Sequence, residues 1–285
     1  MKISLMPDNK INEIIIDHLV KFGKLHILVD PKINDNFFFQ NDFDFESILP
    51  IRDRQDTISA DHECLQLCTI SKQSITDNTL FKIESVIDNI IQNLSNKQSA
   101  AIAILFSKYS NSEIQKQISN AMFMSYCGEY YLFRFYDPHV LKHLVTIFSN
   151  TQICKLLGVI EYWYYWDEAY IELYHQPKII ISDIDYRIDV NQWQQLKLAQ
   201  DFNAYEYQII RQQKRTLTAI QKNTLIQLLN RVNRVKSVKP EKEKLDLLVT
   251  YAMAMPEQFL EKTKDNLFFD LINKQDIDQI KQFLK

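Results

Sequence analysis

Two acidic residues that end predicted strands are the strongest candidates for chemistry. Asp30 closes the run KLHILVD, and Asp137 follows EYYLFRFY. Open α/β sheets place their reactive groups where strands end, and a pair of carboxylates can hold Mg²⁺. These residues therefore predict one enzymatic alternative, a metal-dependent hydrolase of the nuclease or phosphatase kind. That alternative lacks a third acidic ligand, and Asp137 already has the position of a helix N-cap before Pro138.

Arg134 lies inside the aromatic run that leads to Asp137. Its planar guanidinium could bind a carboxylate of a partner protein. It could also form a structural ion pair with Asp30 or with another carboxylate at a strand end. We favour the ion pair, because an arginine in an apolar strand needs a partner whatever the function.

The remaining reactive side chains do not form a recognisable site. His139 and His143 share one face of a predicted helix, but a zinc site needs further ligands, so we expect surface histidines. Cys64 and Cys68 would lie about 13 Å apart in an extended strand, too far for one tetrahedral ion. The sequence contains no G-x-S-x-G turn for a nucleophile. We therefore expect no catalytic residue, no metal site and no cofactor.

Composition excludes several classes of protein. The three glycines, Gly23, Gly128 and Gly158, are too far apart for a phosphate-binding loop. A formal net charge of -3 gives no argument for a nucleic-acid partner. No apolar run approaches the roughly 20 residues that span a bilayer, and MKISLMPDNK lacks the apolar core of a secretory signal. We expect a cytoplasmic protein without a membrane span.

The elements that must position these residues form an α/β lobe followed by an all-α lobe. The run 100–107 has almost no polar face, so it should lie centrally in a sheet that is covered on both sides. The expected strands are 24–30, 64–71, 100–107, 129–136, 159–166 and 169–175, in a mixed sheet flanked by helices. Beyond residue 190 only helical patterns occur, which predicts domains 1–188 and 189–285, with a further break at 235–244.

Short signals mark where helices should begin and end. Ser110 with Glu113, and Ser149 with Gln152, have the spacing of capping boxes. Gly158 follows the second of these helices and should end it, because glycine readily adopts the left-handed backbone that closes helices.

Strands 159–166 and 169–175 are predicted to form a β-hairpin, and its first strand is aromatic on both faces. Tyr162, Tyr164 and Trp166 share one face of its first strand, and Trp163 shares the other with Tyr165. Tyrosine and tryptophan dominate protein-protein contacts, so Tyr162, Trp163, Tyr164 and Trp166, together with Arg134, are candidate partner-binding residues. The alternative is a strand that lies between helices of the first lobe and the helical lobe.

The run FRFYDPHVLKHLV, followed by TQICKLLGVIEYW, resembles the signature of the bacterial type VI secretion adaptor-chaperones. This family carries domain of unknown function number forty-one twenty-three. The match covers Phe133 to Pro138, and Gly158 and the upstream LHILVDP with Asp30 are similar to further family positions. The resemblance gives Asp30, Phe133, Tyr136, Asp137, Pro138 and Gly158 structural roles. His139 and Val159 depart from the residues that are usual in the family.

The resemblance implies an adaptor rather than an enzyme. Such proteins bind a toxin effector in the producing cell and help to place it on the valine-glycine repeat spike protein (VgrG). The expected partners are therefore a toxin effector and VgrG, with direct contact to the spike left open. The rival hypothesis is the metal-dependent hydrolase that uses Asp30 and Asp137.

Overall fold

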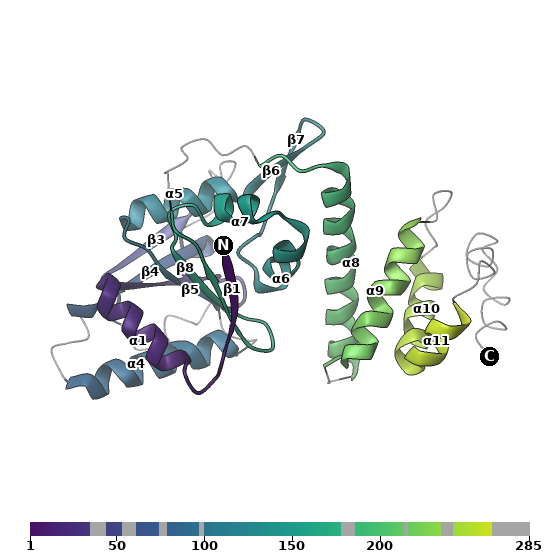
Figure 1. Cartoon of the computed structure of the whole chain (residues 1–285), viewed down its shortest axis with the longest axis horizontal. Coiled ribbons are helices and arrows are strands. Elements are labelled where there is room, and N and C mark those ends of the chain that lie inside the picture. The colour runs from purple at the N-terminus through teal and green to yellow at the C-terminus, as the bar shows by residue number, and fades with distance from the viewer. Residues whose placement is uncertain are drawn as a thin grey trace. The chain divides into compact units, whose positions relative to one another are not determined.

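The computed structural model describes residues 1–34, 44–52, 61–73, 79–96, 100–177, 186–213, 216–234 and 242–263 (Figure 1). The chain divides into two compact units, Met1–Trp193 and Gln194–Lys285. The first unit combines a sheet with helices and the second contains helices, which confirms the predicted α/β lobe followed by an all-α lobe. The predicted boundary, after residue 188, falls just before this division.

A seven-stranded sheet forms the centre of the first unit. Its order is β1 (Lys2–Met6), β9 (Tyr170–Tyr174), β8 (Tyr162–Trp166), β5 (Ala101–Phe106), β2 (Lys24–Val29), β4 (Leu65–Ser71) and β3 (Ser47–Ile51). Every pairing in it is antiparallel, so the expectation of a mixed sheet was wrong. A helix does connect β4 to β5, but β2 lies between these two strands and runs opposite to both.

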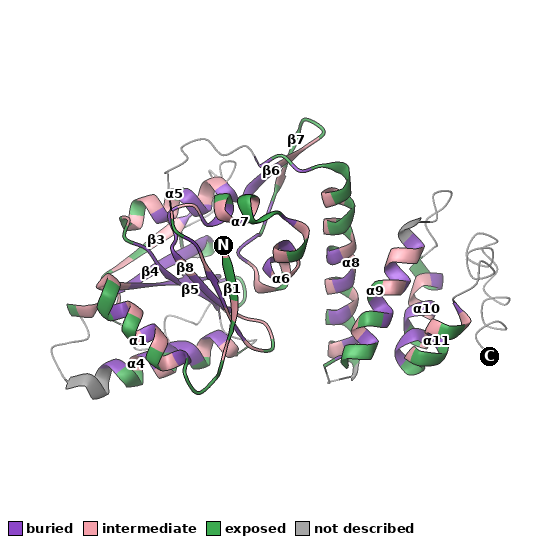
Figure 2. Ribbon diagram, viewed as in Figure 1, coloured by how far each residue is buried: buried purple, intermediate pink, exposed green. Residues whose placement is uncertain are grey.

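Helices lie on both faces of this sheet (Figure 1). Helices α1 (Ile11–Phe22) and α4 (Thr79–Ser95) cover one face, where an aliphatic core forms around residues such as Ile15, Ile27, Ile87 and Ile104. Helices α5 (Asn111–Ala121) and α7 (Asn150–Leu157) lie on the opposite face. Strand β5 is central and buried along its whole length, as its apolar sequence predicted (Figure 2).

The predicted strand 129–136 ends early. Only β7 (Glu129–Leu132) is extended, and it pairs with β6 (Phe123–Tyr126) in a separate two-stranded sheet. Cys127 and Gly128 connect them with positive φ values of 52° and 83°, as a tight hairpin turn requires. After Leu132 the chain turns inward, because Phe133, Phe135 and Tyr136 are all buried and no longer alternate between two faces. The sequence also gave no clear signal for β1, β3 and β6.

The helix boundaries follow the predicted caps. Ser110 and Glu113 form a complete capping box at α5, and Ser149 and Gln152 form another at α7. Gly158 ends α7, with its amide donating to Cys154 O at 2.9 Å. Helix α6 (Pro138–Ile147) lies between them in the chain and starts at Asp137.

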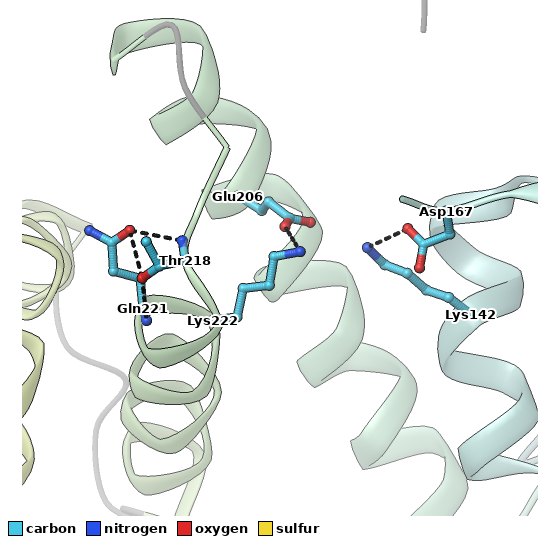
Figure 3. Close-up of polar contacts among 6 residues, drawn as sticks. All are labelled: Lys142, Asp167, Glu206, Thr218, Gln221 and Lys222. Carbon is cyan, nitrogen blue, oxygen red and sulfur yellow. Dashed lines mark hydrogen bonds and ion pairs between the residues drawn. The ribbon is translucent and has the colours of Figure 1, made fainter. Parts of the chain in front are cut away.

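The second unit is a small helical bundle with its own apolar core. Its helices are α8 (Val190–Gln213), which begins in the first unit, α9 (Ala219–Arg234), α10 (Lys242–Ala254) and α11 (Pro256–Lys262). Thr218 and Gln221 form a capping box at α9, and Glu206 of α8 lies 3.6 Å from Lys222 of α9 (Figure 3). Buried residues such as Phe202, Leu228 and Phe259 form the core. Most of the predicted break at 235–244 lies outside the described residues.

No helix among the described residues has both the length and the apolar character needed to cross a bilayer. This agrees with the absence of a long apolar run in the sequence.

Buried His26 should make the protein less stable in mildly acidic solution. Its Nδ1 lies 3.0 Å from Thr69 Oγ1 inside the sheet. Burial, with a smaller contribution from Lys24, lowers the pKa of His26 from 6.5 to about 4. The unfolded chain keeps the ordinary pKa, so from pH 6.5 down to about 4 only the unfolded state gains this proton, and stability falls as the pH drops.

The measurement is urea unfolding of the wild type and of His26→Gln at about pH 7 and about pH 5. The wild type should lose about 2 kcal/mol more than the variant between these two conditions. His26→Gln should be the less stable protein at neutral pH, because the ring packs in the core. Equal losses on acidification would contradict the prediction.

Candidate functional site

Arg134 joins the two acidic residues that could have done chemistry. Its Nη2 lies 2.8 Å from Asp30 Oδ2 and 3.8 Å from Asp137 Oδ2. The Asp30 side chain is buried, whereas the Arg134 side chain is 45% exposed. The predicted ion pair between Arg134 and Asp30 is confirmed, and the two carboxylates of the rival hydrolase are brought together around one guanidinium.

Asp30 is held in place by several contacts at the end of β2. Its amide donates to Ala100 O at 2.8 Å, and its Oδ1 accepts from the Lys32 amide at 3.1 Å. Its Oδ2 accepts from Arg134. Both carboxylate oxygens are therefore engaged with donors that belong to the protein.

This arrangement does not favour a cation between Asp30 and Asp137. The positively charged guanidinium of Arg134 lies beside both carboxylates. A Mg²⁺ ion would have to displace it. Within the described part of the chain, no group of three His, Cys, Asp or Glu side chains is placed to hold a metal ion.

The other residues of the family-like run build a joint between β7 and α6. The Asp137 carboxylate accepts from the His139 amide at 2.9 Å, and Pro138 occupies the first turn of α6. Phe133 and Tyr136 are buried, and burial raises the pKa of Tyr136 to about 12. His139 is exposed on α6, as the sequence predicted, whereas His143 is only partly exposed. Because its pKa is raised, the Tyr136 phenol stays protonated. Phe133 and Tyr136 therefore act through packing, and Asp137 acts by capping α6.

The hairpin formed by β8 and β9 belongs mainly to the core. Trp163 and Tyr164 are fully buried, so their assignment as partner-binding residues was wrong for the folded chain. Trp163 lies 5.7 Å from the Phe135 ring on one face, and Tyr164 joins the aliphatic core on the other. Helices of the first unit and the segment before α6 cover both faces. Tyr162 and Trp166 remain half-buried.

An ionic contact ties the turn of this hairpin to α6. Lys142 Nζ lies 3.5 Å from Asp167 Oδ1 (Figure 3). Both side chains are mostly covered, with 15% and 24% of their surfaces exposed. The contact holds the turn against the helix that starts at Asp137.

Sequence reasoning missed a polar network between the hairpin and α1. Tyr164 Oη donates to Glu172 Oε2 at 2.6 Å and lies 3.0 Å from His18 Nδ1. Burial, followed by the charge of Lys21, lowers the pKa of His18 to about 4, so the ring is neutral at physiological pH. Burial is also the largest cause that raises the pKa of Tyr164. These hydrogen bonds fix the hairpin on α1. One signal was available, since Tyr164 and Glu172 fall on the same face of adjacent strands.

Two exposed side chains, one aromatic and one apolar, lie on the hairpin of β6 and β7. Tyr130 and Leu132 are 65% and 55% exposed. On the same hairpin, the Tyr126 ring stacks on Trp193 with ring centres 4.7 Å apart, and Tyr131 lies at the same distance from Trp193. The first turn of α8 is thereby fixed to the first unit, next to a pair of open apolar side chains.

Comparisons with protein-family models, curated proteins and solved structures found no match to this chain. The resemblance of FRFYDPHVLKHLV to the secretion adaptors therefore stays a prediction from the residues themselves.

The contact between Arg134 and Asp30 should contribute measurably to stability. Arg134→Ala leaves the buried carboxylate with the Lys32 amide as its remaining described donor, so we expect a loss of about 1–2 kcal/mol. The value is modest because nearly half of the Arg134 side chain faces solvent. Arg134→Lys should recover part of the loss, since it keeps the charge without the planar fork.

The measurement is urea unfolding at neutral pH, with Asp137→Asn as the control. Asparagine also caps helices, so this control should change stability by less than about 0.5 kcal/mol. If Arg134→Ala is as stable as the wild type, the ion pair has no structural value.

Proposed function

We propose that this chain is a non-catalytic adaptor-chaperone of a type VI secretion system. It binds a toxin effector in the cytoplasm of the producing cell and helps to load the effector onto the VgrG spike protein. The proposal begins from the resemblance of FRFYDPHVLKHLV and TQICKLLGVIEYW to that family.

The structural observation that carries the proposal is the use of the polar residues in this run. Arg134 pairs with Asp30, and Asp137 caps α6. An enzyme would keep such a guanidinium and such carboxylates available for substrate. Here they form contacts within the protein, at the connection between β7 and α6. A binding role is supported further by the open apolar side chains of Tyr130 and Leu132, since exposed aromatic and apolar residues near each other are typical of protein contacts.

A tagged copy of the chain, captured after gentle lysis of a producing cell, tests the proposal. Mass spectrometry should identify a large toxin and the VgrG spike among the captured proteins, and neither should be captured by a tagged unrelated cytoplasmic protein. Recovery of neither protein would lead us to abandon the adaptor function. The position of the gene between a spike gene and a toxin-immunity pair would be an independent check.

The hydrolase that uses Asp30 and Asp137 remains the alternative, and its test is separate. Calorimetric titration of the wild type with Mn²⁺ should give no binding heat if Arg134 holds both carboxylates. Specific binding that Asp137→Asn weakens would favour the hydrolase, because the asparagine keeps the cap but is a poorer metal ligand.

A further inference from the structure

The two edges of the large sheet differ in how they are protected. Edge strands expose unpaired amide and carbonyl groups that can pair with another chain, so proteins usually block them. Strand β3 is blocked: it contains Pro50, whose carbonyl accepts from Gln115 of α5 at 2.6 Å. Asn111 of the same helix donates to Ser47 Oγ at 2.8 Å. Helix α5 therefore covers this edge.

Strand β1 has none of these protections among the described residues. It pairs with β9 on one side, and no described strand or helix end pairs with its other side. Its sequence, KISLM, contains no proline, and it forms a regular register with β9 without a bulge. Figure 2 shows this strand as mostly exposed.

The side chains of β1 add an apolar surface to the open edge. Ile3 and Leu5 are 45% and 73% exposed and share one face of the strand. On β9, Leu173 and Ile171 stand opposite them in the register. A strand placed beside β1 would cover Ile3 and Leu5 with its own side chains while its backbone continued the sheet.

An open pocket of about 870 Å³ lies at the first residue of β1. Its polar lining includes Lys2, Lys155, Asn150, Thr151, His175 and Gln176. The lining contains two lysines, and no carboxylate is among the lining side chains that the structure describes. Neither lysine has an ion-pair partner within the described ranges. The pocket therefore favours a negatively charged group.

Charge and strand direction together determine how a peptide would bind. Strand β1 runs away from the pocket, from Lys2 to Met6. A strand added in the antiparallel sense would bring its C-terminal end to the lysines, whereas a parallel strand would bring its N-terminal end there. We infer that β1 and this pocket bind an extended apolar segment of a partner protein, antiparallel to β1, with a carboxylate at its C-terminal end.

A second copy of this chain is a poorer occupant. Pairing of β1 with another β1 would join strands of only five residues. The area buried would fall well below the roughly 1,600 Å² that is typical of a stable interface. A peptide strand needs less area, because main-chain bonds provide affinity and alternate side chains provide specificity.

The inference deepens the proposed function, since the segment would belong to the effector or spike, but its test is independent of the capture experiment. The probe is a fluorescein-labelled peptide of alternating threonine and valine with a free C-terminal carboxylate, measured by fluorescence anisotropy on the full chain. We expect saturable binding to the wild type, and at least about tenfold weaker binding when prolines replace alternate residues of the peptide. An amidated peptide should bind at least about threefold more weakly.

Variants of the chain locate the site. Leu5→Lys should weaken binding at least about tenfold, because a charge on an edge strand opposes pairing. Val20→Lys is the matched control, since Val20 is 54% exposed on α1, and it should bind like the wild type. In the double variant Lys2→Glu with Lys155→Glu, the acid and amide peptides should bind equally. Circular dichroism spectra and melting curves confirm that each variant is folded.

An amidated peptide that ends in aspartate separates the two sources of a carboxylate. Restored binding assigns the pocket to an acidic side chain, and continued weak binding assigns it to a chain terminus.

Absence of saturable binding by the wild type up to about 1 mM would overturn the inference. A wild-type dimer in light scattering that Leu5→Lys converts to a monomer would also overturn it, by assigning the edge to a second copy. If the peptide does not bind but the toxin is captured, only this inference is lost. If the peptide binds but neither the toxin nor VgrG is captured, only the proposed function is lost.

Discussion

Replacing Gly158 by alanine should lower the free energy of unfolding by about 3–5 kcal/mol. Gly158 ends α7 with φ 54° and ψ -108°, a backbone conformation that residues with a Cβ adopt only with strain. A Cβ at this position would also overlap the side-chain amide of Gln117. That amide is buried and donates to the carbonyls of Lys155 and Leu156, each at 3.0 Å, so its displacement would leave the end of α7 unsatisfied.

Gly23→Ala is the matched control for this prediction. Gly23 also ends a helix, with φ 74°, but no atom lies within 4 Å of its hypothetical Cβ. It should therefore show the backbone cost alone, about 1 kcal/mol. Adding Gln117→Ala to Gly158→Ala should remove the overlap and recover part of the stability. Urea unfolding followed by circular dichroism provides the comparison, and equal losses for the two single glycine variants would refute the role of Gln117.

Trp163→Ala should be similarly damaging, with a loss of about 3–5 kcal/mol. The side chain is fully buried in β8 and contacts the Phe135 ring, so alanine leaves a large cavity between the sheet and the start of α6. The Trp163 Nε1 has no hydrogen-bond partner in the described structure. Trp163→Phe keeps an aromatic ring and removes that unpaired donor, so it should lose only about 1–2 kcal/mol.

Trp166→Ala separates stability from partner binding. Trp166 is half-buried at the end of the same strand, so its removal should cost less than that of Trp163. Chemical unfolding gives the stabilities, and capture from lysate gives the binding. Loss of partners with Trp163→Ala alone would reflect unfolding, whereas loss with folded Trp166→Ala would indicate a contact. A Trp163→Ala protein as stable as the wild type would contradict the observed core.

The sequence predicted the elements whose apolar pattern is strong. The strands around 24–30, 64–71 and 100–107 and the aromatic hairpin all exist, because a buried strand needs a continuous apolar run. Strand β1 was missed because it is only five residues long, so the alternation of Ile3 and Leu5 with polar residues is too short to stand out. Strand β3 was missed because Pro50 interrupts it. Strand order depends on contacts between distant segments, which local periodicity does not encode.

In the candidate site, the ion pair of a charged side chain could be predicted from the sequence, but the burial of the aromatic side chains could not. Arg134 needed a carboxylate, and its shorter contact is with Asp30, which is 104 residues away. For Trp163 and Tyr164, alternation placed the two side chains on opposite faces correctly. It gave no information on which face helices would cover. The same residue types serve cores and interfaces, so only the packed structure could distinguish the two roles.

The pairing of β1 with β9 has a consequence for synthesis. Residues 2–6 leave the ribosome well before residues 170–174, with which they pair. Strand β1 therefore stays without its neighbour until most of the first unit has emerged, and contacts over such long separations form slowly. During that interval both sides of KISLM are open.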